Sequence, residues 1–531
     1  MDTGQEHDKP QSFIPQPVTA LSQSPHLDPH PTTRQFVHSL LRHRNHWFTI
    51  AQITPAIVRG NASIPAGRPI GHHAALEKGP VMSAATEYQV MSTWERPQDE
   101  EQQTMVRKVS VSSFMGNFIE WFDYASYSYF ATVIATVFFP TSDRTVALMQ
   151  TFGVFALSFI LRPIGALFWG SFGDKRGRKS ALSLSIILMS GASFLIGCLP
   201  SYEAIGLAAP GLLLLLRMVQ GFSASGEYAG AATFLGEYAP SSKRGIYCSL
   251  IPASTAIGLL AGSTLATVMT SNLSTTALSG WGWRIPFLLA GPLGLIVHYI
   301  RTQLADSPVY EEMTQALENK EKTAADGASP LKVLFRDHLR ELVISFGASV
   351  LNAVGFYTVL TYLPTYLSET VGMDATQSST ITTICLVLYV LLVFGMGHIS
   401  DRFGRKKVLI SACVAFIVLT VPAFAILNTG LFWPVLLVEL ALCATLTAND
   451  GTLSSYLTET FPTNVRFTGF AFSFNLANAL FGGTAPFIAT WLIYTTKSTM
   501  SPAWYMVGIA CIALVAMILS HENTDKDLAS I

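Results

Sequence analysis

The stretch Gly170-Ser-Phe-Gly-Asp-Lys-Arg-Gly-Arg-Lys179 has a second copy 227 residues later, Gly397-His-Ile-Ser-Asp-Arg-Phe-Gly-Arg-Lys406. Five positions are identical at that offset, and each copy lies between two long apolar runs. A second pair follows the same pattern, because Glu237-Tyr-Ala-Pro-Ser-Ser-Lys-Arg244 recurs as Glu459-Thr-Phe-Pro-Thr-Asn-Val-Arg466 with the acid, the proline and the arginine at the same spacing. This duplication predicts two parallel bundles that move against each other around a central site.

The composition is typical of a membrane protein that spans the bilayer many times. Of the 531 residues, 50% are hydrophobic and only 13% are charged, whereas soluble domains carry about 25% charged residues. The six cysteines lie singly in or beside apolar runs, without the spacing of metal ligands, so we interpret them as packing residues. A net charge of −1 gives no indication of nucleic-acid binding, and we expect neither a metal site nor a cofactor.

Twelve apolar segments have lengths close to the ~20 residues that a bilayer requires. We therefore predict an all-α membrane protein in which twelve transmembrane helices form two pseudo-symmetric bundles of six. The expected spans are residues 109–138, 145–172, 180–199, 207–236, 245–270 and 283–300 in the first half, and 340–367, 377–399, 408–427, 431–458, 467–494 and 501–520 in the second.

The distribution of charge in the loops predicts the orientation of the chain. Lysine and arginine gather on one side, in residues 107–108, 175–179, 243–244, 320–340, 402–407 and 466. Positive loops mark the cytoplasm, so both termini and the middle linker are expected there, in a multi-pass protein of the cell inner membrane. The expected parts are a cytoplasmic extension (1–104), two six-helix bundles (105–300 and 340–520), a cytoplasmic linker between them (301–339) and a cytoplasmic tail (521–531).

The first 104 residues differ from the rest of the chain in composition. They hold 8 of the 12 histidines and 11 of the 27 prolines, without an apolar run long enough to span. Such a segment is expected to be disordered. Two interpretations stay open: a natural N-terminal extension, or a natural start at Met82 or Met91 with the preceding residues not part of the native protein.

The repeated loops resemble the signature that the major facilitator superfamily carries between helices 2 and 3 and between helices 8 and 9. Arg217-Met-Val-Gln-Gly221 resembles the second motif of that superfamily. Four further segments are similar to its metabolite:proton symporter branch: Gly116-Asn-Phe-Ile-Glu-Trp-Phe-Asp123, Leu161-Arg-Pro-Ile-Gly165, Gln220-Gly-Phe-Ser-Ala-Ser-Gly-Glu-Tyr228 and Gly282-Trp-Arg-Ile-Pro-Phe287. Within that branch the chain is most similar to the proline and betaine carriers, for example in Leu360-Thr-Tyr-Leu-Pro-Thr-Tyr-Leu-Ser368.

The resemblance implies a proton-coupled symporter that imports a small polar solute by alternating access. The first expectation is a zwitterion such as proline or glycine betaine; the alternatives are a di- or tricarboxylate such as ketoglutarate or citrate, and a membrane sensor without transport. The sequence has no phosphate loop, so we expect no ATP-driven pump. It has neither a His-Glu-x-x-His motif nor a nucleophile elbow, so we expect no enzyme. The expected partners are the solute, protons and membrane lipids, and the protein is expected to be a monomer.

Two acids in the first span, Glu120 and Asp123, are the main candidates for proton coupling. They lie three residues apart and so share a helix face, and a charge at the centre of a bilayer costs about 2.5–3.5 kcal/mol. One interpretation is that one of them binds the coupling proton; the other is a permanent ion pair with an arginine that fixes helix packing. Arg162 and Arg217 are the available cationic partners. Arg217 is the expected coupling arginine, and Glu227 is the alternative proton site.

Polar and aromatic residues near those acids are the candidates for substrate binding. Tyr124 and Tyr127 share their face, and aromatic rings hold quaternary ammonium groups well, although packing rings are common in any membrane protein. The predicted substrate-binding residues are Asn117, Tyr124, Tyr127, Arg162 and Gln220. Glu439 and Asp450 lie in the tenth span, and one interpretation places both in the cavity. For Asp450, near its expected cytoplasmic end, a gate and a surface position are equally open.

The repeated motifs are expected to form a cytoplasmic gate. Glycines allow helix ends to approach closely, and Asp174 and Asp401 can pair with arginines or with helix N-termini across the interface between the bundles. The predicted gate residues are Gly170, Asp174, Gly177, Arg178, Gly397, Asp401, Gly404, Arg405, Glu237, Arg244, Glu459 and Arg466.

Overall fold

The structure is a computed structural model that describes residues 84–139, 144–321, 329–524 and 526–530. All regular elements among these residues are helical. The first helix, α3, begins at Ala84, so residues 84–104 of the expected extension are helical. Glutamate and glutamine, which are good helix formers, are frequent at residues 98–103. The remainder of that extension, residues 1–83, lies outside the described residues.

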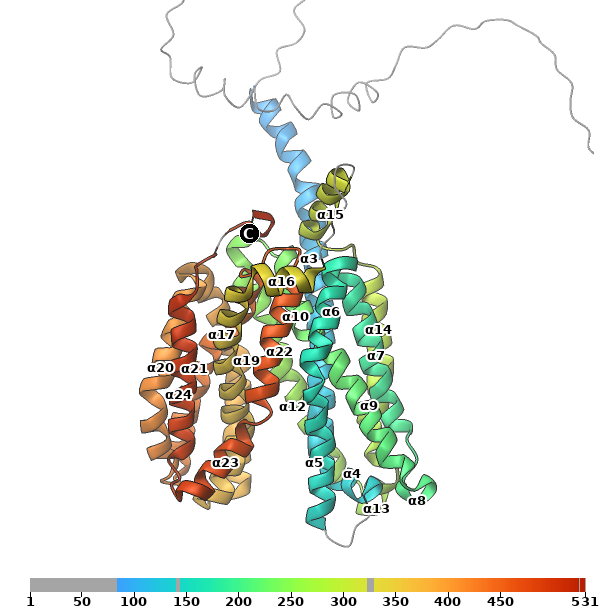
Figure 1. The fold of residues 1–531 in the computed structure, drawn as a ribbon, viewed down its shortest axis with the longest axis vertical. Helices are drawn as coiled ribbons and strands as arrows, with labels where there is room; N and C mark the ends of the chain where they lie inside the picture. The colour runs from blue at the N-terminus through green and yellow to red at the C-terminus, as the bar shows by residue number, and fades with distance from the viewer. Residues whose placement is uncertain (1–83, 140–143, 322–328, 525, 531) are drawn as a thin grey trace, which may run out of the picture. The chain divides into compact units, whose positions relative to one another are not determined.

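Several spans of the first half are broken into two helices (Figure 1). The second span breaks at Leu161 because Pro163 lacks an N–H and its ring disfavours continuation of the preceding helical turn. The elements are α3 (Ala84–Tyr129) with α4 (Ala131–Phe138), α5 (Arg144–Ile160) with α6 (Arg162–Arg176), α7 (Arg178–Cys198), α9 (Ala208–Ala224) with α10 (Glu227–Tyr238), α11 (Arg244–Cys248) with α12 (Leu250–Asn272), and α14 (Arg284–Thr302).

The second half repeats this arrangement after two linker helices. The linker helices are α15 (Pro308–Glu321) and α16 (Pro330–Asp337). The spans are α17 (Leu339–Tyr357) extended to Val371 through π turns, α19 (Ala375–Phe403), α20 (Arg405–Leu427), α21 (Phe432–Thr458), α22 (Arg466–Ala477) with α23 (Ala485–Thr496), and α24 (Ser501–Leu519).

The described helices confirm the predicted fold class. Ten of them are long and apolar enough to cross a membrane. Two further segments, α3 with α4 and α9 with α10, carry more polar residues and complete the twelve spans of an all-α fold in two bundles. Each bundle is held mainly by its own helices, for example α14 against α7 and α3 against α12.

The two bundles meet through small residues. Helix α6 runs beside α22 (Figure 1), and α11 and α12 pack on α19. At the first contact Gly170 faces the backbone of Thr468, and at the second Gly245 faces the carbonyl of Gly397. A side chain at either glycine would meet the partner's backbone, so the glycines allow the helices to approach this closely.

Candidate functional site

The two acids of α3 each pair with an arginine from another helix of the N-terminal bundle. The Nη2 of Arg162 donates to Glu120 Oε1 at 2.6 Å and to the Tyr124 hydroxyl at 2.6 Å. The Nη1 of Arg217 donates to Asp123 Oδ2 at 2.8 Å. All of these side chains are buried. The structure therefore brings Glu120 and Asp123 together with both arginines that the sequence offered as partners.

These pairs leave polar atoms without a partner. Among the described residues, Glu120 Oε2, Arg162 Nε, and Arg217 Nε and Nη2 accept or donate no hydrogen bond. The guanidinium of Arg217 lies 3.7 Å from the ring centre of Tyr127, a cation–π contact. A buried ion pair in which some atoms have no hydrogen bond gives up fewer hydrogen bonds when its partners change.

Gln220 completes this cluster. Its amide Nε2 donates to Asp123 Oδ1 at 3.1 Å and to Ser193 Oγ at 2.5 Å, and its carbonyl accepts from Arg217 at 2.9 Å. All three hydrogen bonds of the Gln220 amide are made to protein side chains. In this state Gln220 therefore supports the Asp123–Arg217 pair.

Glu227, in contrast, belongs to a fully bonded ion pair. Both of its carboxylate oxygens accept from the guanidinium of Arg301, and Oε2 also accepts from Ser185 Oγ at 3.4 Å. Arg301 donates in addition to the carbonyl of Leu182 at 2.5 Å. Sequence reasoning missed Arg301 because it follows an apolar span and was assigned to the linker.

Two predicted substrate-binding residues make structural contacts instead of facing a free space. The Asn117 amide donates to the Ile251 carbonyl at 3.0 Å, to Ser254 Oγ at 2.8 Å and to Thr255 Oγ1 at 2.9 Å, which ties α3 to α12. The Tyr127 hydroxyl donates to the Thr151 carbonyl at 2.9 Å.

A small cavity lies between the two bundles and is lined by residues from both. Its volume is about 20 Å³, enough for about one water molecule, so a larger solute requires the lining side chains to move. Aromatic rings dominate the lining, and the described residues around it include no lysine or arginine. The lining residues are Trp121, Tyr228, Pro252, Thr255, Asn352, Phe356, Tyr389, Asp450, Phe474 and Asn478.

Rings from the two halves touch at this cavity. Trp121 of α3 lies 5.2 Å from Phe356 of α17, measured between ring centres. Tyr228 of α10 stacks on Phe474 of α22 at 4.4 Å, and its hydroxyl is 3.0 Å from Ser454 Oγ of α21. The cavity is therefore closed by side chains that separate whenever the bundles separate.

Asp450 is the acidic residue of this lining. It is fully buried and accepts hydrogen bonds from the Asn352 amide and from the Tyr389 hydroxyl, each at 2.6 Å. Among the described acids buried in the protein, Asp450 and Glu439 lack an ion-pair partner, whereas the others contact an arginine. The structure places Asp450 in the lining of this cavity and not on the surface, which agrees with one of the positions considered from the sequence.

The repeated loops lie at one end of both bundles, which we call the basic end (residues 175–179 and 402–407 with their neighbours). Asp174 accepts from the backbone N–H groups of Phe467 and Thr468 at 3.2 and 2.9 Å, at the N-terminus of α22. Asp401 accepts from Gly245 and Ile246 at 2.7 and 3.0 Å, at the N-terminus of α11. Each aspartate thus bridges to the first turn of a helix in the other bundle, where the helix dipole favours an anion.

The paired glutamates join the same network. Glu237 accepts from Arg178 at 3.1 Å and from Arg466 of the other bundle at 2.8 Å. Glu459 accepts from Arg405 at 3.2 Å and from Arg244 of the other bundle at 2.8 Å. The network is pseudo-symmetric, and it brings the predicted acidic and basic gate residues together.

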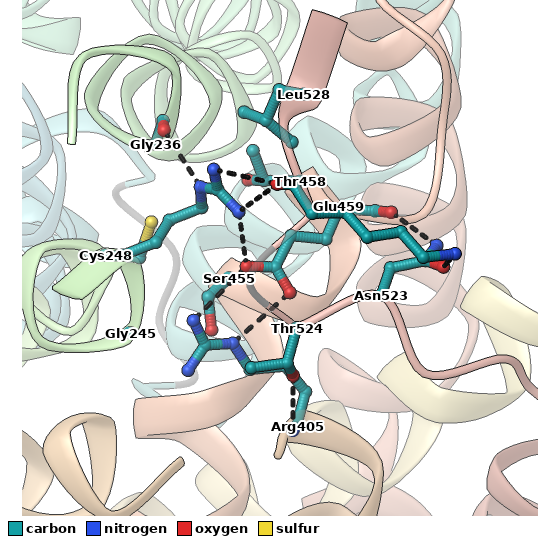
Figure 2. A network of polar contacts seen from close by, with 12 residues as sticks. Gly236, Gly245, Cys248, Arg405, Ser455, Thr458, Glu459, Asn523, Thr524 and Leu528 are labelled. Atoms are coloured by element: carbon teal, nitrogen blue, oxygen red, sulfur yellow. Dashed lines mark hydrogen bonds and ion pairs between the residues drawn. The ribbon is translucent and has the colours of Figure 1, made fainter. Parts of the chain in front are cut away.

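The C-terminal tail also belongs to this network, which the sequence did not indicate. Figure 2 shows Asn523, Thr524 and Leu528 around Glu459 and Arg405. The Asn523 amide donates to the Glu459 carbonyl at 2.8 Å, and Thr524 Oγ1 accepts from the Arg405 N–H at 3.1 Å. The Leu528 carbonyl accepts from Arg466 at 2.8 Å, and the Lys526 carbonyl from Arg244 at 3.4 Å.

An acid caps the helix that follows each repeated loop. Gly177 and Gly404 have φ angles of +94° and +96°, which favour glycine, and the chain then enters α7 or α20. Asp306 accepts from the N–H of Arg178 at 3.0 Å, and Glu522 accepts from the N–H of Arg405 at 3.2 Å. Burial raises the pKa of the Asp306 carboxyl, and its hydrogen bonds from backbone N–H groups oppose that rise.

The family model of the Major Facilitator Superfamily matches residues 114–486 and 345–529. The chain belongs to the major facilitator superfamily. Its relatives include the glycine betaine/proline/ectoine/pipecolic acid transporter OusA of Dickeya dadantii, 35% identical over 80% of this chain and 85% of the relative. The proline/betaine transporter of Escherichia coli K12 is 34% identical over the same shares.

Solved structures of this superfamily share the fold. The proton:xylose symporter XylE bound to 6-bromo-6-deoxy-D-glucose aligns with a TM-score of 0.68 at 18% identity, over 81% of this chain and 98% of that one. The inward-open form of XylE from E. coli aligns with a TM-score of 0.54 at 19% identity, over 80% and 98% of the two chains. The protein is a multi-pass membrane transporter for a small molecule, and its relatives are transporters and not enzymes.

Proposed function

We propose that this member of the superfamily is a proton symporter that imports a small zwitterion of the proline and betaine type by alternating access. The observation that carries the proposal is the cavity between the bundles, whose described lining combines aromatic rings and one carboxylate without a basic side chain. Aromatic faces and a carboxylate together suit a cationic nitrogen. The relatives named as proline and betaine transporters support the same substrate class.

A di- or tricarboxylate fits this site less well. Such a substrate needs two or more cations, but Arg162 and Arg217 are engaged by Glu120 and Asp123. Neither arginine belongs to the described cavity lining. A zwitterion carries one carboxylate only, so the site does not have to neutralise an excess of negative charge.

We further propose that the basic end faces the cytoplasm of a cell whose inner membrane holds the carrier. Positive residues gather at that end, in agreement with the rule that cytoplasmic loops are basic. The network of Asp174, Asp401, Glu237 and Glu459 joins the bundles there, so the present state is closed toward the cytoplasm. Transport requires these contacts to break and re-form in each cycle. The protein is proposed to act as a monomer.

Uptake into proteoliposomes tests the proposed function. Labelled proline, betaine, ketoglutarate and citrate are offered with an inward proton gradient, with and without a protonophore. Proline or betaine uptake that collapses with the protonophore supports the proposal. Gradient-driven uptake of the acids alone would overturn the substrate class, and no flux of any of the four would overturn transport of these solutes.

The helix α3 acids are proposed to carry the coupling proton. Their pairs with Arg162 and Arg217 leave several atoms unbonded, whereas both oxygens of Glu227 are occupied. Protonation of Glu120 or Asp123 releases its arginine, and that exchange links proton binding to the helix contacts. We place Glu227 with Arg301 in a structural pair, so it takes no part in the proposed coupling.

We predict that Asp123→Asn abolishes uphill uptake driven by a proton gradient. The amide keeps the size of the side chain and hydrogen bonds to Gln220, but it can neither bind a proton nor neutralise Arg217. Exchange of labelled for unlabelled substrate without a gradient should persist, which also shows that the variant is folded. Glu203→Gln removes an exposed acid outside the site and is the matched control. Normal accumulation by the Asp123 variant would remove this residue from the coupling role.

A further inference from the structure

We propose that Asp450 is the counter-ion for the cationic nitrogen of the substrate and the main determinant of selectivity for zwitterions. This inference rests on the proposed function and assigns the ligand of one substrate group. It starts from a contrast between buried acids: most of those described contact an arginine, while the carboxylate of Asp450 contacts an amide and a hydroxyl. A charged carboxylate that is buried without a cation is costly, and a positively charged ligand beside it would offset that cost.

The geometry leaves Asp450 able to receive that charge. A carboxylate has about four acceptor positions, and the Asn352 amide and the Tyr389 hydroxyl occupy one on each oxygen. The two donors come from α17 and α19, so they hold the carboxylate in place from two sides. The side chain lines the cavity, and the remaining acceptor positions are available to a ligand there.

Aromatic rings surround the same space. Trp121 and Tyr228 come from the N-terminal bundle, and Phe356 and Phe474 from the C-terminal bundle. A methylated ammonium group gains from contact with several ring faces, and a carboxylate beside them adds a direct charge interaction. Because the rings belong to both bundles, a bound cation contacts both halves of the carrier at once.

Glu439 shows that an unpaired acid alone does not make the site. It lies on the same helix, α21, and is also buried, but its carboxylate accepts from Thr382 and it does not line the cavity. The combination of acid, rings and free space thus distinguishes Asp450.

Binding measurements on the purified full chain test this inference. The probes are glycine betaine and 3,3-dimethylbutanoate, an anion of almost the same shape in which carbon replaces the positive nitrogen. The wild type is expected to bind betaine at least about 100-fold more tightly, because the isostere leaves the carboxylate without a cation. In Asp450→Asn the affinity for betaine should fall by about 100-fold, and the two ligands should bind within about threefold of each other.

Two further variants test whether the effect depends on the charge of Asp450 and on its position. Asp450→Glu keeps the charge and should retain a preference for betaine of about tenfold or more. Glu369→Gln removes an exposed acid outside the cavity and should behave as the wild type. A purely structural role of Asp450 would weaken both ligands equally and leave their ratio unchanged.

The inference is overturned if Asp450→Asn keeps the wild-type preference for betaine. If that variant does not fold, the measurement on the wild type is used instead. A wild-type preference for betaine over 3,3-dimethylbutanoate of less than about tenfold would also overturn the inference. The two proposals fail separately. A wild type that transports zwitterions with protons but whose preference is insensitive to Asp450 refutes this inference alone, whereas the predicted binding pattern without proton-driven uptake refutes the proton coupling alone.

Discussion

Glu237→Gln is expected to open the basic end of the carrier. The carboxylate of Glu237 neutralises Arg178 of its own bundle and Arg466 of the other, and these side chains are fully buried. Removal of one partner from a buried ion pair costs about 3–5 kcal/mol, because the remaining charge stays without compensation. Even the lower figure shifts the equilibrium between the closed and open states by about 100-fold.

Cys248 offers a native reporter for this opening. It is buried on α11 at the basic end, close to the interface with Thr458 of α21. The rate at which a water-soluble maleimide labels Cys248, followed by peptide mass spectrometry, should rise strongly in Glu237→Gln. The control is Glu312→Gln, which removes an exposed acid from the linker helix α15. Equal labelling rates in the two variants would contradict a gate role for Glu237.

Gly170→Ala is expected to prevent closure of the same end. A Cβ atom at Gly170 would lie 2.5 Å from the Cα atom and 2.9 Å from the nitrogen of Thr468, so α6 and α22 have to move apart. Overpacking of this kind costs about 1–3 kcal/mol. The closed state should therefore be destabilised about 5- to 160-fold, and proton-driven uptake should fall by at least about fivefold.

Gly191 provides the matched control for this prediction. It lies on α7, and a Cβ atom there would meet nothing within 4 Å. Gly191→Ala removes the same backbone freedom in a helix without a clash, so its uptake should equal that of the wild type. Equal uptake by the two alanine variants would mean that α6 and α22 do not need this close contact.

The fold could be predicted from the sequence because its determinants are local and repeated. The length of an apolar run decides whether a segment spans, and the two copies around Asp174 and Asp401 show the duplication without knowledge of any contact. The break at residues 225–226 was not predicted, since it depends on how the helix packs on its neighbours. The break at Leu161 was missed because the length of an apolar run takes no account of Pro163.

The candidate site was predictable only in part. Helix spacing identified the acids Glu120 and Asp123 and the arginines available to them, but the choice of partner is a matter of three-dimensional position. Arg301 was missed for this reason, because a cation at the end of a span gives no sign that it turns inward. The sequence could not decide the depth of Asp450, because cavity, gate and surface positions all suit an acid in this part of a helix until the facing helices are known.

The buried setting of the gate network determines how the carrier responds to its ionic surroundings. Mobile ions weaken the attraction between charges that lie in water, over a Debye length of about 8 Å at physiological salt, and they act much less on buried pairs. The side chains of Arg178, Glu237 and Arg466 are 0% exposed. A rise in salt concentration should therefore leave the contacts of this network almost unchanged, while the exposed Lys175 and Lys407 at the same end feel the full change in screening.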